Sequence, residues 1–377
     1  MEKVTRVLHV LRIMEMGGAQ NLIMNLYRNI NIEKVQFDFL VSEKGTFDEE
    51  IIKMGGKIYY IPYLTKVGQE KYEKQIINFL RDHEEYKIVH SHIDQVTGII
   101  MQAAKKAGVK VRIAHSHSTG NTNNLLGKIY KKYLQNKINK NATNLFACSE
   151  NAAKWLYKNK YKEAVIIKNG IDVEKFQYNS EKRNKIREEL GVSENTILIG
   201  HVGSFSKVKN HKFLIDVFDE YQKEVNDTKL ILVGEGILQE EIKKKVELYG
   251  LENKVEFLGK RMDTDYIYSA LDIFVFPSYF EGICTAMIEA QSEGLPIITS
   301  DEIDRNTDIT KTIKFLRLNE GINKWTDAVK NVEKINRNNQ SIKKMIIENG
   351  YDIKENAKNI QKLYNEFYTK SMEDKNE

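Results

Sequence analysis

The chain has no uninterrupted apolar run of about 18 residues, the length that a membrane-spanning helix needs. It has only two cysteines, Cys148 and Cys284, which are too few for a disulfide framework and favour a reducing compartment. The first residues form a charged start and a short strand-like run containing Arg12, unlike a signal peptide. We therefore expect a cytoplasmic protein without a membrane span.

Tandem repeats and low-complexity tracts are also absent from the 377 residues. Hydrophobic residues make up 41% of the chain and charged residues 29%, as in globular proteins. The net charge of +5 is mild, and no nucleic-acid partner is expected. Because a single hydrophobic core rarely serves so long a chain, we expect two domains.

Apolar, β-branched segments alternate with helical segments, a pattern typical of a mostly parallel sheet with connecting helices. The expected strands lie at 7–11, 36–41, 57–61, 87–90, 111–115, 144–147, 196–202, 230–233, 255–258, 272–276 and 296–299. An amphipathic helix is expected at 21–29, and helical stretches near the C-terminus are expected at 322–335, 342–349 and 353–368. The predicted fold class is therefore α/β.

Glycine pairs follow two of these strands, but neither has the spacing of a dinucleotide fingerprint. Gly17 and Gly18 follow the first strand, where glycine either lets the backbone approach a ligand or makes a plain turn. No third glycine follows at the required spacing, and Gly234-Glu-Gly236 fails the same test. An NAD-dependent enzyme is therefore disfavoured.

The segment from Phe276 to Ser300 predicts a strand, a loop, a helix and a second strand. Gly282 opens the loop, and Gly294 and Pro296 end the helix in the usual order. The loop lies at the carboxyl end of a parallel strand, where open α/β sheets bind their ligands.

Two acids flank the start of this helix. Glu281 lies in the loop, and Glu289 lies about 7.5 Å beyond residue 284, at about 1.5 Å per helical residue. Free amides near Ile283, Cys284 and Thr285 can bind phosphate. This order of acid, anion site and acid matches the sugar hydroxyls, diphosphate and ribose hydroxyls of a nucleoside diphosphate sugar. The alternative is that Glu289 is one of 53 acids on a solvated helix face.

Two His-Ser-His triplets, at 90–92 and 115–117, contain four of the eight histidines and follow strands at their carboxyl ends. Zinc binding is one interpretation, but no acid or cysteine accompanies the triplets. Packing or hydrogen bonding at the strand ends is a second interpretation. A third depends on a family resemblance.

Four short motifs, Pro277-Ser-x-x-Glu281-Gly, Glu289-Ala, Gly294-Leu-Pro296 and Ser300-Asp301, together resemble the donor-site signature of glycosyltransferase family 4. This resemblance implies a retaining enzyme of the GT-B fold, in which two doubly wound, Rossmann-like α/β domains face a cleft. It implies an N-terminal acceptor-binding domain at 1–172 and a C-terminal nucleotide-sugar-binding domain at 173–350. A C-terminal helix within 351–377 would return to the first domain.

The resemblance assigns catalytic roles to His117, Glu281 and Lys209. Glu281 is expected to hold the donor sugar, Glu289 the ribose and Lys209 the diphosphate. His117 is expected near the anomeric carbon, with His115 as the alternative. The remaining expected substrate-binding residues are Gly17, Gly18, Asn169, Ser204, Lys207, Met262, Gly282, Ile283, Cys284 and Thr285.

Three positions depart from the family pattern. Gln20 replaces the acid that usually follows the first glycine pair, and Lys168 replaces the proline of a Pro-Asn-Gly segment. Ser204 stands where an arginine usually holds the diphosphate. A hydroxyl cannot supply the charge or the forked donors of arginine, so Lys207 is the candidate to compensate.

The reaction that the resemblance implies is transfer of a hexose from a nucleoside diphosphate sugar, expected to be a UDP-sugar, to a saccharide acceptor. The acceptor is expected to be lipid-linked, as in bacterial exopolysaccharide or capsule synthesis. The alternatives are a nucleotide-sugar-binding module with impaired catalysis, motivated by Ser204 and Gln20, and a GT-B nucleotide-sugar epimerase.

No metal and no cofactor are expected for this reaction. Asp263-Thr-Asp265 imitates the metal motif of a different glycosyltransferase fold. The motif directly precedes a predicted helix, so we interpret it as a helix N-cap.

One long stretch has no acidic residue. From Gln95 to Ser149 there is no Asp or Glu, although nine lysines and arginines occur there. Six apolar residues recur at helical spacing among the lysines: Leu125, Leu126, Ile129, Tyr133, Leu134 and Ile138. This pattern predicts a basic amphipathic helix and peripheral binding to an anionic membrane surface, expected to be the inner face of the cell membrane. The alternative is a core-facing helix with a solvated basic face.

Overall fold

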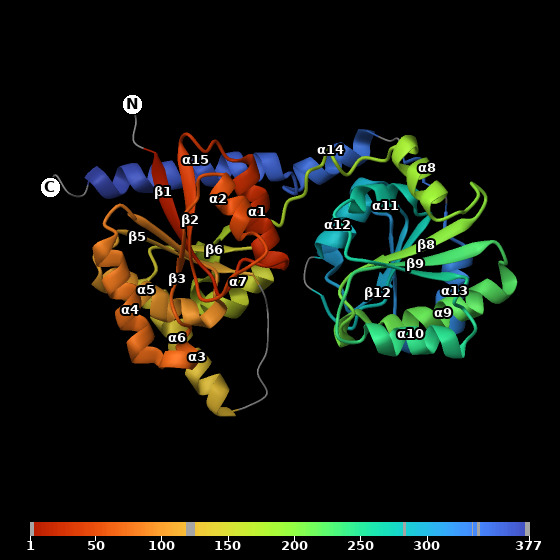
Figure 1. Ribbon diagram of the computed structural model, residues 1–377, viewed down its shortest axis with the longest axis horizontal. Coiled ribbons are helices and arrows are strands. Elements are labelled where there is room, and N and C mark those ends of the chain that lie inside the picture. The colour runs from red at the N-terminus through yellow and green to blue at the C-terminus, as the bar shows by residue number, and fades with distance from the viewer. Residues whose placement is uncertain (1–3, 118–124, 282–283, 334, 338–339, 374–377) are drawn as a thin grey trace. The chain divides into compact units, whose positions relative to one another are not determined.

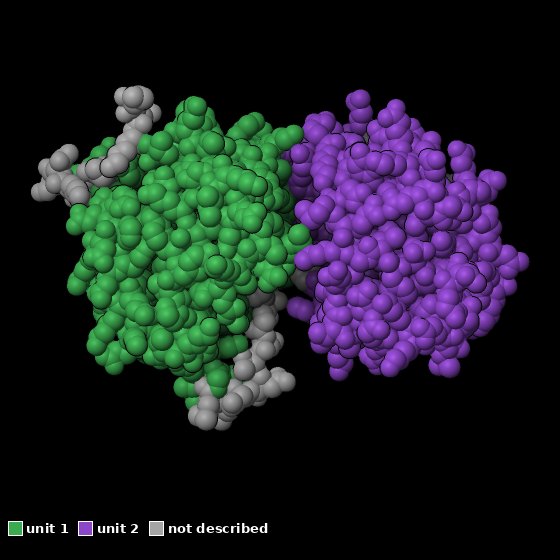
Figure 2. Space-filling model, in the orientation of Figure 1, with its two compact units in different colours: residues 1–170, 353–377 green, residues 171–352 purple. Residues whose placement is uncertain are grey.

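The computed structural model describes residues 4–117, 125–281, 284–333, 335–337 and 340–373. The chain forms two compact units, coloured separately in Figure 2. The first unit contains residues 1–170 together with 353–377, and the second contains 171–352. Within the described residues, no helix combines the length and the apolarity needed to cross a bilayer.

The first unit is built on a seven-stranded sheet whose paired strands all run parallel, in the order β3-β2-β1-β4-β5-β6-β7 (Figure 1). The strands are β1 Thr5–Val10, β2 Val35–Val41, β3 Ile58–Tyr60, β4 Ile88–Ser91, β5 Val111–Ser116, β6 Asn144–Ala147 and β7 Val165–Ile166. Most of β1, β2, β4 and β5 is buried, because helices cover both faces of the sheet.

The helices of the first unit are α1 Gly18–Asn29, α2 Asp48–Lys53, α3 Leu64–Val67, α4 Gln69–Asp82, α5 Thr97–Lys106, α6 Leu125–Asn141, α7 Glu150–Tyr157 and α15 Ile353–Glu373. One face of the sheet packs against α1, α2 and α15, and the other packs against α4, α5, α6 and α7. The C-terminal helix α15 lies beside α1 and β1, and it buries Ala357, Ile360 and Tyr364 in the core of this unit (Figure 1).

The second unit has a six-stranded sheet in the order β10-β9-β8-β11-β12-β13, again with parallel pairs. Its strands are β8 Ile197–Val202, β9 Thr228–Val233, β10 Val255–Gly259, β11 Ile273–Phe276, β12 Ile297–Ser300 and β13 Ile313–Leu316. Its helices are α8 Ser180–Glu189, α9 His211–Glu224, α10 Gln239–Leu248, α11 Thr264–Ala270, α12 Thr285–Ser292, α13 Ile322–Lys330 and α14 Gln340–Glu348.

Helices α9, α10 and α13 cover one face of the second sheet, and α8, α11, α12 and α14 cover the other. The prediction of two parallel, doubly wound α/β units is therefore confirmed. In both sheets the strand order reverses once, between β1 and β4 and between β8 and β11. Ligands of open α/β sheets bind outside the carboxyl ends of the strands at such reversals.

One helix begins earlier than the sequence predicts. Helix α1 starts at Gly18, although we expected the helix only from Asn21. Gly17 is its N-cap residue, with an extended backbone and no side-chain cap. The usual Ser, Thr, Asp or Asn signal is missing here, which hid the start of the helix. Gly18 therefore lies in the first turn of α1 and not in the loop before it.

Candidate functional site

In the second unit, the loop after β8 is tied to the loop after β11. The amide of Tyr279 donates to the carbonyl of Val208 at 2.8 Å, and the side-chain amide of Asn210 donates to the carbonyl of Pro277 at 3.1 Å. Asn210 has a left-handed backbone with φ of 55°, a conformation that asparagine tolerates better than most residues. These contacts hold the 3₁₀ turn Lys207–Lys209 against the carboxyl end of β11.

Three glycines allow this loop to pack closely. A Cβ atom on Gly234 would lie 2.2 Å from the carbonyl oxygen of Gly203, and one on Gly203 would lie 3.3 Å from Cε of Lys209. A Cβ atom on Gly236 would lie 2.6 Å from the carbonyl oxygen of Phe205. The Gly234-Glu-Gly236 pattern is thus explained by backbone packing under the Lys209 loop, without a dinucleotide fingerprint.

Lys209 and Glu281 form an ion pair, with 2.7 Å between Nζ and Oε1. The same ammonium lies 4.5 Å from the ring centroid of Phe276, at the end of β11, and 4.0 Å from Sγ of Cys284. Burial alone would lower the pKa of Lys209, but the negative charge of Glu281 beside it raises that pKa. Burial raises the pKa of the Cys284 thiol, so the thiol stays neutral.

Cys284 is also the N-cap residue of α12, and Thr285 is the first helical residue. Cys284 has an extended backbone and no side-chain cap, while its carbonyl accepts from the amides of Met287 and Ile288. The first amides of such a helix have no intrahelical acceptor and attract anions. Lys209 therefore stands beside a helix N-terminus. Gly282 and Ile283, which we also expected here, lie outside the described residues.

Glu289 lies one helical turn further along α12. Its Oε2 accepts a hydrogen bond from the hydroxyl of Tyr268 at 3.0 Å. Although part of the side chain is accessible, protein atoms surround the carboxyl, and this burial raises the pKa of Glu289 to about 7. Tyr268 belongs to α11 and was not identified from the sequence, because its position depends on how α11 packs beside α12.

The other residues expected at the diphosphate and the base are more exposed. The Ser204 hydroxyl donates only to the neighbouring Ser206 hydroxyl, at 3.4 Å, among the recorded contacts of the described residues. Lys207 is exposed and lines a cavity of about 340 Å³ together with Ser206 and Tyr279. Met262 is 66% exposed, and its carbonyl accepts from Nζ of Lys175 at 3.3 Å.

The N-cap position expected in the Asp263-Thr-Asp265 motif is confirmed, but without a side-chain cap. Asp263 does occupy the N-cap position of α11, but its carboxylate makes no capping bond. Instead it accepts two hydrogen bonds from the guanidinium of Arg261, each 2.8 Å long. A bidentate charged pair outcompetes a neutral amide donor. Asp265 is buried and pairs with Lys175 and Lys182.

In the first unit, both His-Ser-His triplets converge with a further histidine at the carboxyl ends of β1, β4 and β5. His9 of β1 stands opposite His90 of β4 in the sheet register. The five imidazoles, from His9, His90, His92, His115 and His117, pack against one another. Burial lowers the pKa of every one of them, to about 3 for His9 and His117, so all are neutral at pH 7. His9 was not identified from the sequence, because only the pairing of β1 with β4 places it opposite His90.

The remaining predicted residues of the first unit lie around two loops. A Cβ on Gly17 would lie 2.7 Å from Oε1 of Gln20, whereas nothing lies within 4 Å of one on Gly18. Gln20 donates to the carbonyl of Ile13 at 3.3 Å. The Oδ1 atom of Asn169 is buried and has no hydrogen-bond partner among the described residues.

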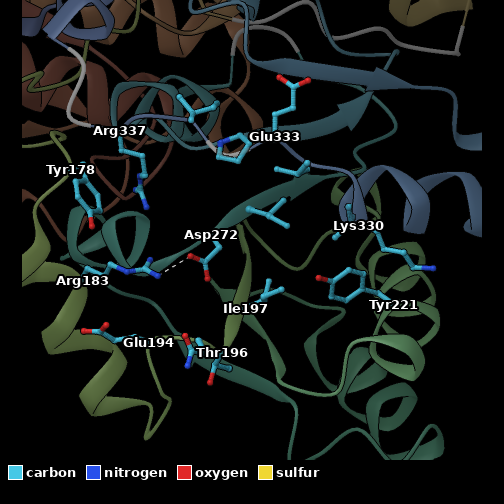
Figure 3. Close-up of a pocket in the computed structure, with 16 residues that line it drawn as sticks. Tyr178, Arg183, Glu194, Thr196, Ile197, Tyr221, Asp272, Lys330, Glu333 and Arg337 are labelled. Atoms are coloured by element: carbon cyan, nitrogen blue, oxygen red, sulfur yellow. Dashed lines mark hydrogen bonds and ion pairs between the residues drawn. The ribbon is translucent and has the colours of Figure 1, made fainter.

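A cavity of about 530 Å³ in the second unit lies elsewhere, at the amino ends of β8 and β11 (Figure 3). Arg183 points at Asp272 there, with 2.8 Å between Nη2 and Oδ1. Asp272 also accepts from the amide of Leu198 and from Arg187. These charges hold the amino edge of the sheet together, and none of the predicted site residues lines this cavity.

Comparisons with known proteins agree with this architecture. Residues 16–175 match the model of Glycosyltransferase Family 4, and residues 182–353 match that of Glycosyl transferases group 1. The structure of Anabaena HepE in complex with UDP has the same fold, with a TM-score of 0.77 at 18% identity over 96% of this chain and 100% of that one. The two units therefore define the GT-B class of fold.

Three relatives are similar over most of their length. The putative glycosyltransferase EpsF of Bacillus subtilis is 35% identical, over 96% of each chain. The UDP-Gal:alpha-D-GlcNAc-diphosphoundecaprenol alpha-1,3-galactosyltransferase of Escherichia coli is 28% identical, over 95% of this chain and 96% of its own. The capsular polysaccharide biosynthesis glycosyltransferase CapH of Staphylococcus aureus is 27% identical, over 82% of this chain and 84% of its own. The chain belongs to glycosyltransferase family 4.

Proposed function

We propose that the protein transfers a hexose from a UDP-sugar to a hydroxyl of a lipid-linked saccharide, with retention at the anomeric carbon, during synthesis of a bacterial exopolysaccharide or capsule. The observation that carries the donor assignment is the ion pair of Lys209 and Glu281 beside the N-terminus of α12, with Glu289 on the same helix. The names of the E. coli and S. aureus relatives support the UDP-sugar, the lipid diphosphate carrier and the capsule.

The donor diphosphate takes over the role that Glu281 has in the free protein. Lys209 has one close anionic partner there, and a diphosphate at the N-terminus of α12 offers several. Glu281 is then released to accept hydrogen bonds from the sugar hydroxyls, and Glu289 accepts them from the ribose. Lys209 and the first amides of α12 stabilise the charge that develops on the diphosphate as it leaves.

Retention does not require a protein nucleophile in this mechanism. The acceptor hydroxyl attacks the face from which the diphosphate departs, and the leaving diphosphate takes the acceptor proton. The protein contributes positioning and charge stabilisation. His117 is assigned to the region of the anomeric carbon, with His115 next to it in the histidine cluster. No metal or cofactor takes part.

A binding module without turnover is the second candidate, and Ser204 favours it. Its hydroxyl contacts Ser206 and brings no positive charge to the diphosphate. Calorimetry with a panel of nucleotide sugars tests whether the protein binds a donor and which one. The proposal predicts that UDP and one or more UDP-sugars bind, and that Glu289→Ala weakens both. A protein that binds no uridine nucleotide would overturn the donor assignment.

We also propose that α6 holds the protein on an anionic membrane surface. Ile129, Tyr130 and Tyr133 are 61%, 41% and 48% exposed on this helix, while Leu134 and Ile138 point into the core. The apolar residues at helical spacing therefore divide between the core and the solvent. Exposed Lys128 and Lys132 lie among the solvent-facing ones. Apolar side chains among lysines are typical of helices that lie in a membrane interface.

A basic cavity extends this surface towards α5. It has a volume of about 500 Å³ and is lined by Lys105, Lys106, Lys137 and Lys140 together with polar side chains and Tyr133. Lys106 pairs with Glu73 and Lys137 lies over the ring of Tyr133. An anionic headgroup fits this cavity, because the described residues that line it include four lysines and no acid. Each basic group near an anionic leaflet contributes about 1 kcal/mol.

A further inference from the structure

The cavity of about 340 Å³ beside Lys207 lies at the carboxyl edge of the second sheet, where three loops meet. Its described lining comes from residues 206–212 after β8, residues 238–242 after β9 and Tyr279 after β11. Helices α9 and α10, which carry part of this lining, cover one face of the sheet (Figure 1). The other face packs against α12, which carries Cys284 at its start and Glu289. The cavity and the candidate donor site therefore lie on different sides of the loop after β8.

The 3₁₀ turn Lys207–Lys209 separates the two sites. Lys209 pairs with Glu281, whereas Lys207 lines the cavity. Lys209, Glu281 and Glu289 are not among the described residues that line it. The cavity is thus a place for a group other than the nucleotide of the donor.

His211, the first residue of α9, is the buried polar group of this cavity. Only 3% of it is exposed, and neither ring nitrogen has a hydrogen-bond partner among the described residues. The ring stacks on Phe205, with centroids 4.2 Å apart, and lies edge-on to His201 at 4.6 Å. Burial lowers the pKa of His211 to about 4, so the neutral ring offers one N–H donor and one lone pair. Buried polar groups rarely stay unpaired, so His211 indicates that a hydrogen-bonding ligand binds here.

The rest of the lining combines hydroxyl, charged and apolar groups. The Ser206 hydroxyl accepts from Ser204 and keeps its own proton for a further acceptor. Lys212 of α9 pairs with Glu241 of α10, which leaves no net charge from these two residues. Apolar surface comes from Leu238, Ile242 and the ring of Tyr279, a side chain that is 49% exposed.

A sugar ring has the chemistry that this lining requires. Sugar hydroxyls both donate and accept hydrogen bonds, as a neutral imidazole does, and the apolar face of a pyranose packs on an aromatic ring. Inorganic phosphate accepts hydrogen bonds better than it donates them and would be repelled by the carboxylate of Glu241. Cavities that bind small molecules have about 300–1,000 Å³, so this one, at the small end, suits a single sugar ring.

We propose that this cavity binds one sugar ring of the acceptor saccharide, which stacks on Tyr279 and forms hydrogen bonds with His211 and Ser206. Tyr279 lies two residues before Glu281, the residue assigned to the donor sugar, so the two sugars are held by one loop. The second unit thereby takes part in choosing the acceptor. That the bound sugar belongs to the acceptor rests on the proposed transfer reaction, whereas the binding of sugars in this cavity does not.

NMR of the full-length protein with labelled histidines tests the binding step. The probes are the methyl glycosides of glucose, galactose and N-acetylglucosamine at millimolar concentrations, each with and without saturating UDP. We expect at least one glycoside to shift the ring signals of His211 under both conditions. A panel in which no glycoside shifts these signals would overturn the proposal. So would a shift caused by inorganic phosphate and by none of the glycosides.

Substitutions in the lining separate stacking from hydrogen bonding. Tyr279→Ala should weaken the glycoside roughly 3–10-fold, while Tyr279→Phe keeps the ring and most of the affinity. His211→Phe keeps the stack on Phe205 without its hydrogen bonds and should cost roughly 5-fold or more. The matched control is Tyr249→Ala, which removes a 39% exposed ring outside the cavity and should change nothing. Equal affinity of the wild type and Tyr279→Ala contradicts the proposal, and this comparison decides if His211→Phe does not fold.

Turnover distinguishes this proposal from the donor assignment. Tyr279→Ala should raise the KM of the acceptor and leave the KM of the UDP-sugar and the affinity for UDP unchanged. An unchanged acceptor KM in Tyr279→Ala, or equal losses for donor and acceptor, would contradict an acceptor site in this cavity. A protein whose His211 signals respond to glycosides but which binds no uridine nucleotide would overturn the donor assignment and leave the sugar site standing.

Discussion

Nζ of Lys209 lies 2.7 Å from Oε1 of Glu281, and each of these groups is the charged partner of the other in the free protein. The pair is mostly shielded from solvent, with 14% and 22% of the two side chains exposed. A donor diphosphate must therefore compete with Glu281 for Lys209. Because of this competition, substitutions of Lys209 and of Glu281 should change UDP binding differently, although the two side chains are in contact.

Substitutions of this pair should have opposite effects on UDP. Glu281→Gln removes the competitor of the diphosphate, so UDP should bind as well as before or more tightly. The UDP-sugar should lose about 1.5–3 kcal/mol through the missing charged hydrogen bonds to the sugar. Lys209→Met should weaken both ligands. Calorimetry with UDP and UDP-sugar measures all four values.

Lys212→Met is a suitable control, because Lys212 of α9 forms an exposed ion pair with Glu241 of α10. It should leave both affinities close to those of the wild type. Equal losses of UDP and UDP-sugar in the Glu281→Gln variant would contradict the assignment of Glu281 to the sugar.

Glu289 should make stability depend on pH in a predictable direction. Burial raises the pKa of Glu289 to about 7, whereas an exposed glutamate has a pKa of about 4.3. Between these values the folded protein binds more protons than the unfolded chain, so this group lowers stability as the pH rises. Glu289→Gln stays neutral and can still accept from Tyr268. The free energy of unfolding of Glu289→Gln minus that of the wild type should therefore be larger at about pH 8 than at about pH 5, by roughly 1–3 kcal/mol.

Chemical unfolding of both proteins at the two pH values measures this difference. A stability difference that does not change with pH would show that Glu289 is not buried in this way. The same variant should bind UDP more weakly above pH 7, because the ribose hydroxyls lose an ionised acceptor. A gain in stability combined with a loss of nucleotide binding is typical of a functional group.

Position 204 tests whether the missing arginine matters. If the diphosphate lacks a cation there, Ser204→Arg should tighten UDP binding by about 1–3 kcal/mol. If exposed Lys207 already provides the charge, Lys207→Ala should weaken UDP binding and Ser204→Arg should change little. Calorimetry with UDP distinguishes the two cases. No response to either substitution would show that this loop does not reach the phosphates.

The membrane surface is tested by sedimentation with vesicles. The wild type should bind anionic vesicles at low salt, bind neutral vesicles poorly and dissociate as salt is added. Changing Lys128, Lys131 and Lys132 of α6 together to Glu should remove binding, at about 1 kcal/mol or more for each lysine. The control changes Lys223, Lys243 and Lys244 of the second unit to Glu, with the same change in net charge. Equal binding by the two triple variants would rule out α6 as the membrane surface.

Much of the fold could be predicted because its signals are local. The alternation of apolar strands and helices predicted mostly parallel α/β sheets, the chain length predicted two domains, and Gly294 and Pro296 predicted the end of α12. The positions of Glu281 and Glu289 before and within that helix follow from the same local pattern. The rest could not be predicted, because it depends on contacts between distant segments. Tyr364 reaches His90 from a helix 274 residues further along the chain.

The division of the apolar residues of α6 between a buried and an exposed face could not be predicted from the sequence either. Its apolar residues recur at helical spacing, but only the packed structure shows that Leu134 and Ile138 are buried while Ile129 and Tyr133 are exposed. Asp263 is a similar case, since Arg261 lies two residues away and competes with the helix N-terminus for the carboxylate. Local propensity therefore predicted the N-cap position of Asp263, whereas the ion pair with Arg261 determines which donors its carboxylate accepts.

The most direct test of the central claim is turnover with a panel of nucleotide sugars, in the presence and absence of a diphosphate-linked saccharide acceptor in detergent. We expect release of UDP from a UDP-sugar that depends on the acceptor, and NMR of the product should show the anomeric configuration of the donor. Glu281→Gln should abolish this release while UDP still binds. Conversion of a nucleotide sugar without any acceptor, an inverted product, or no turnover of any donor despite UDP binding would contradict the account.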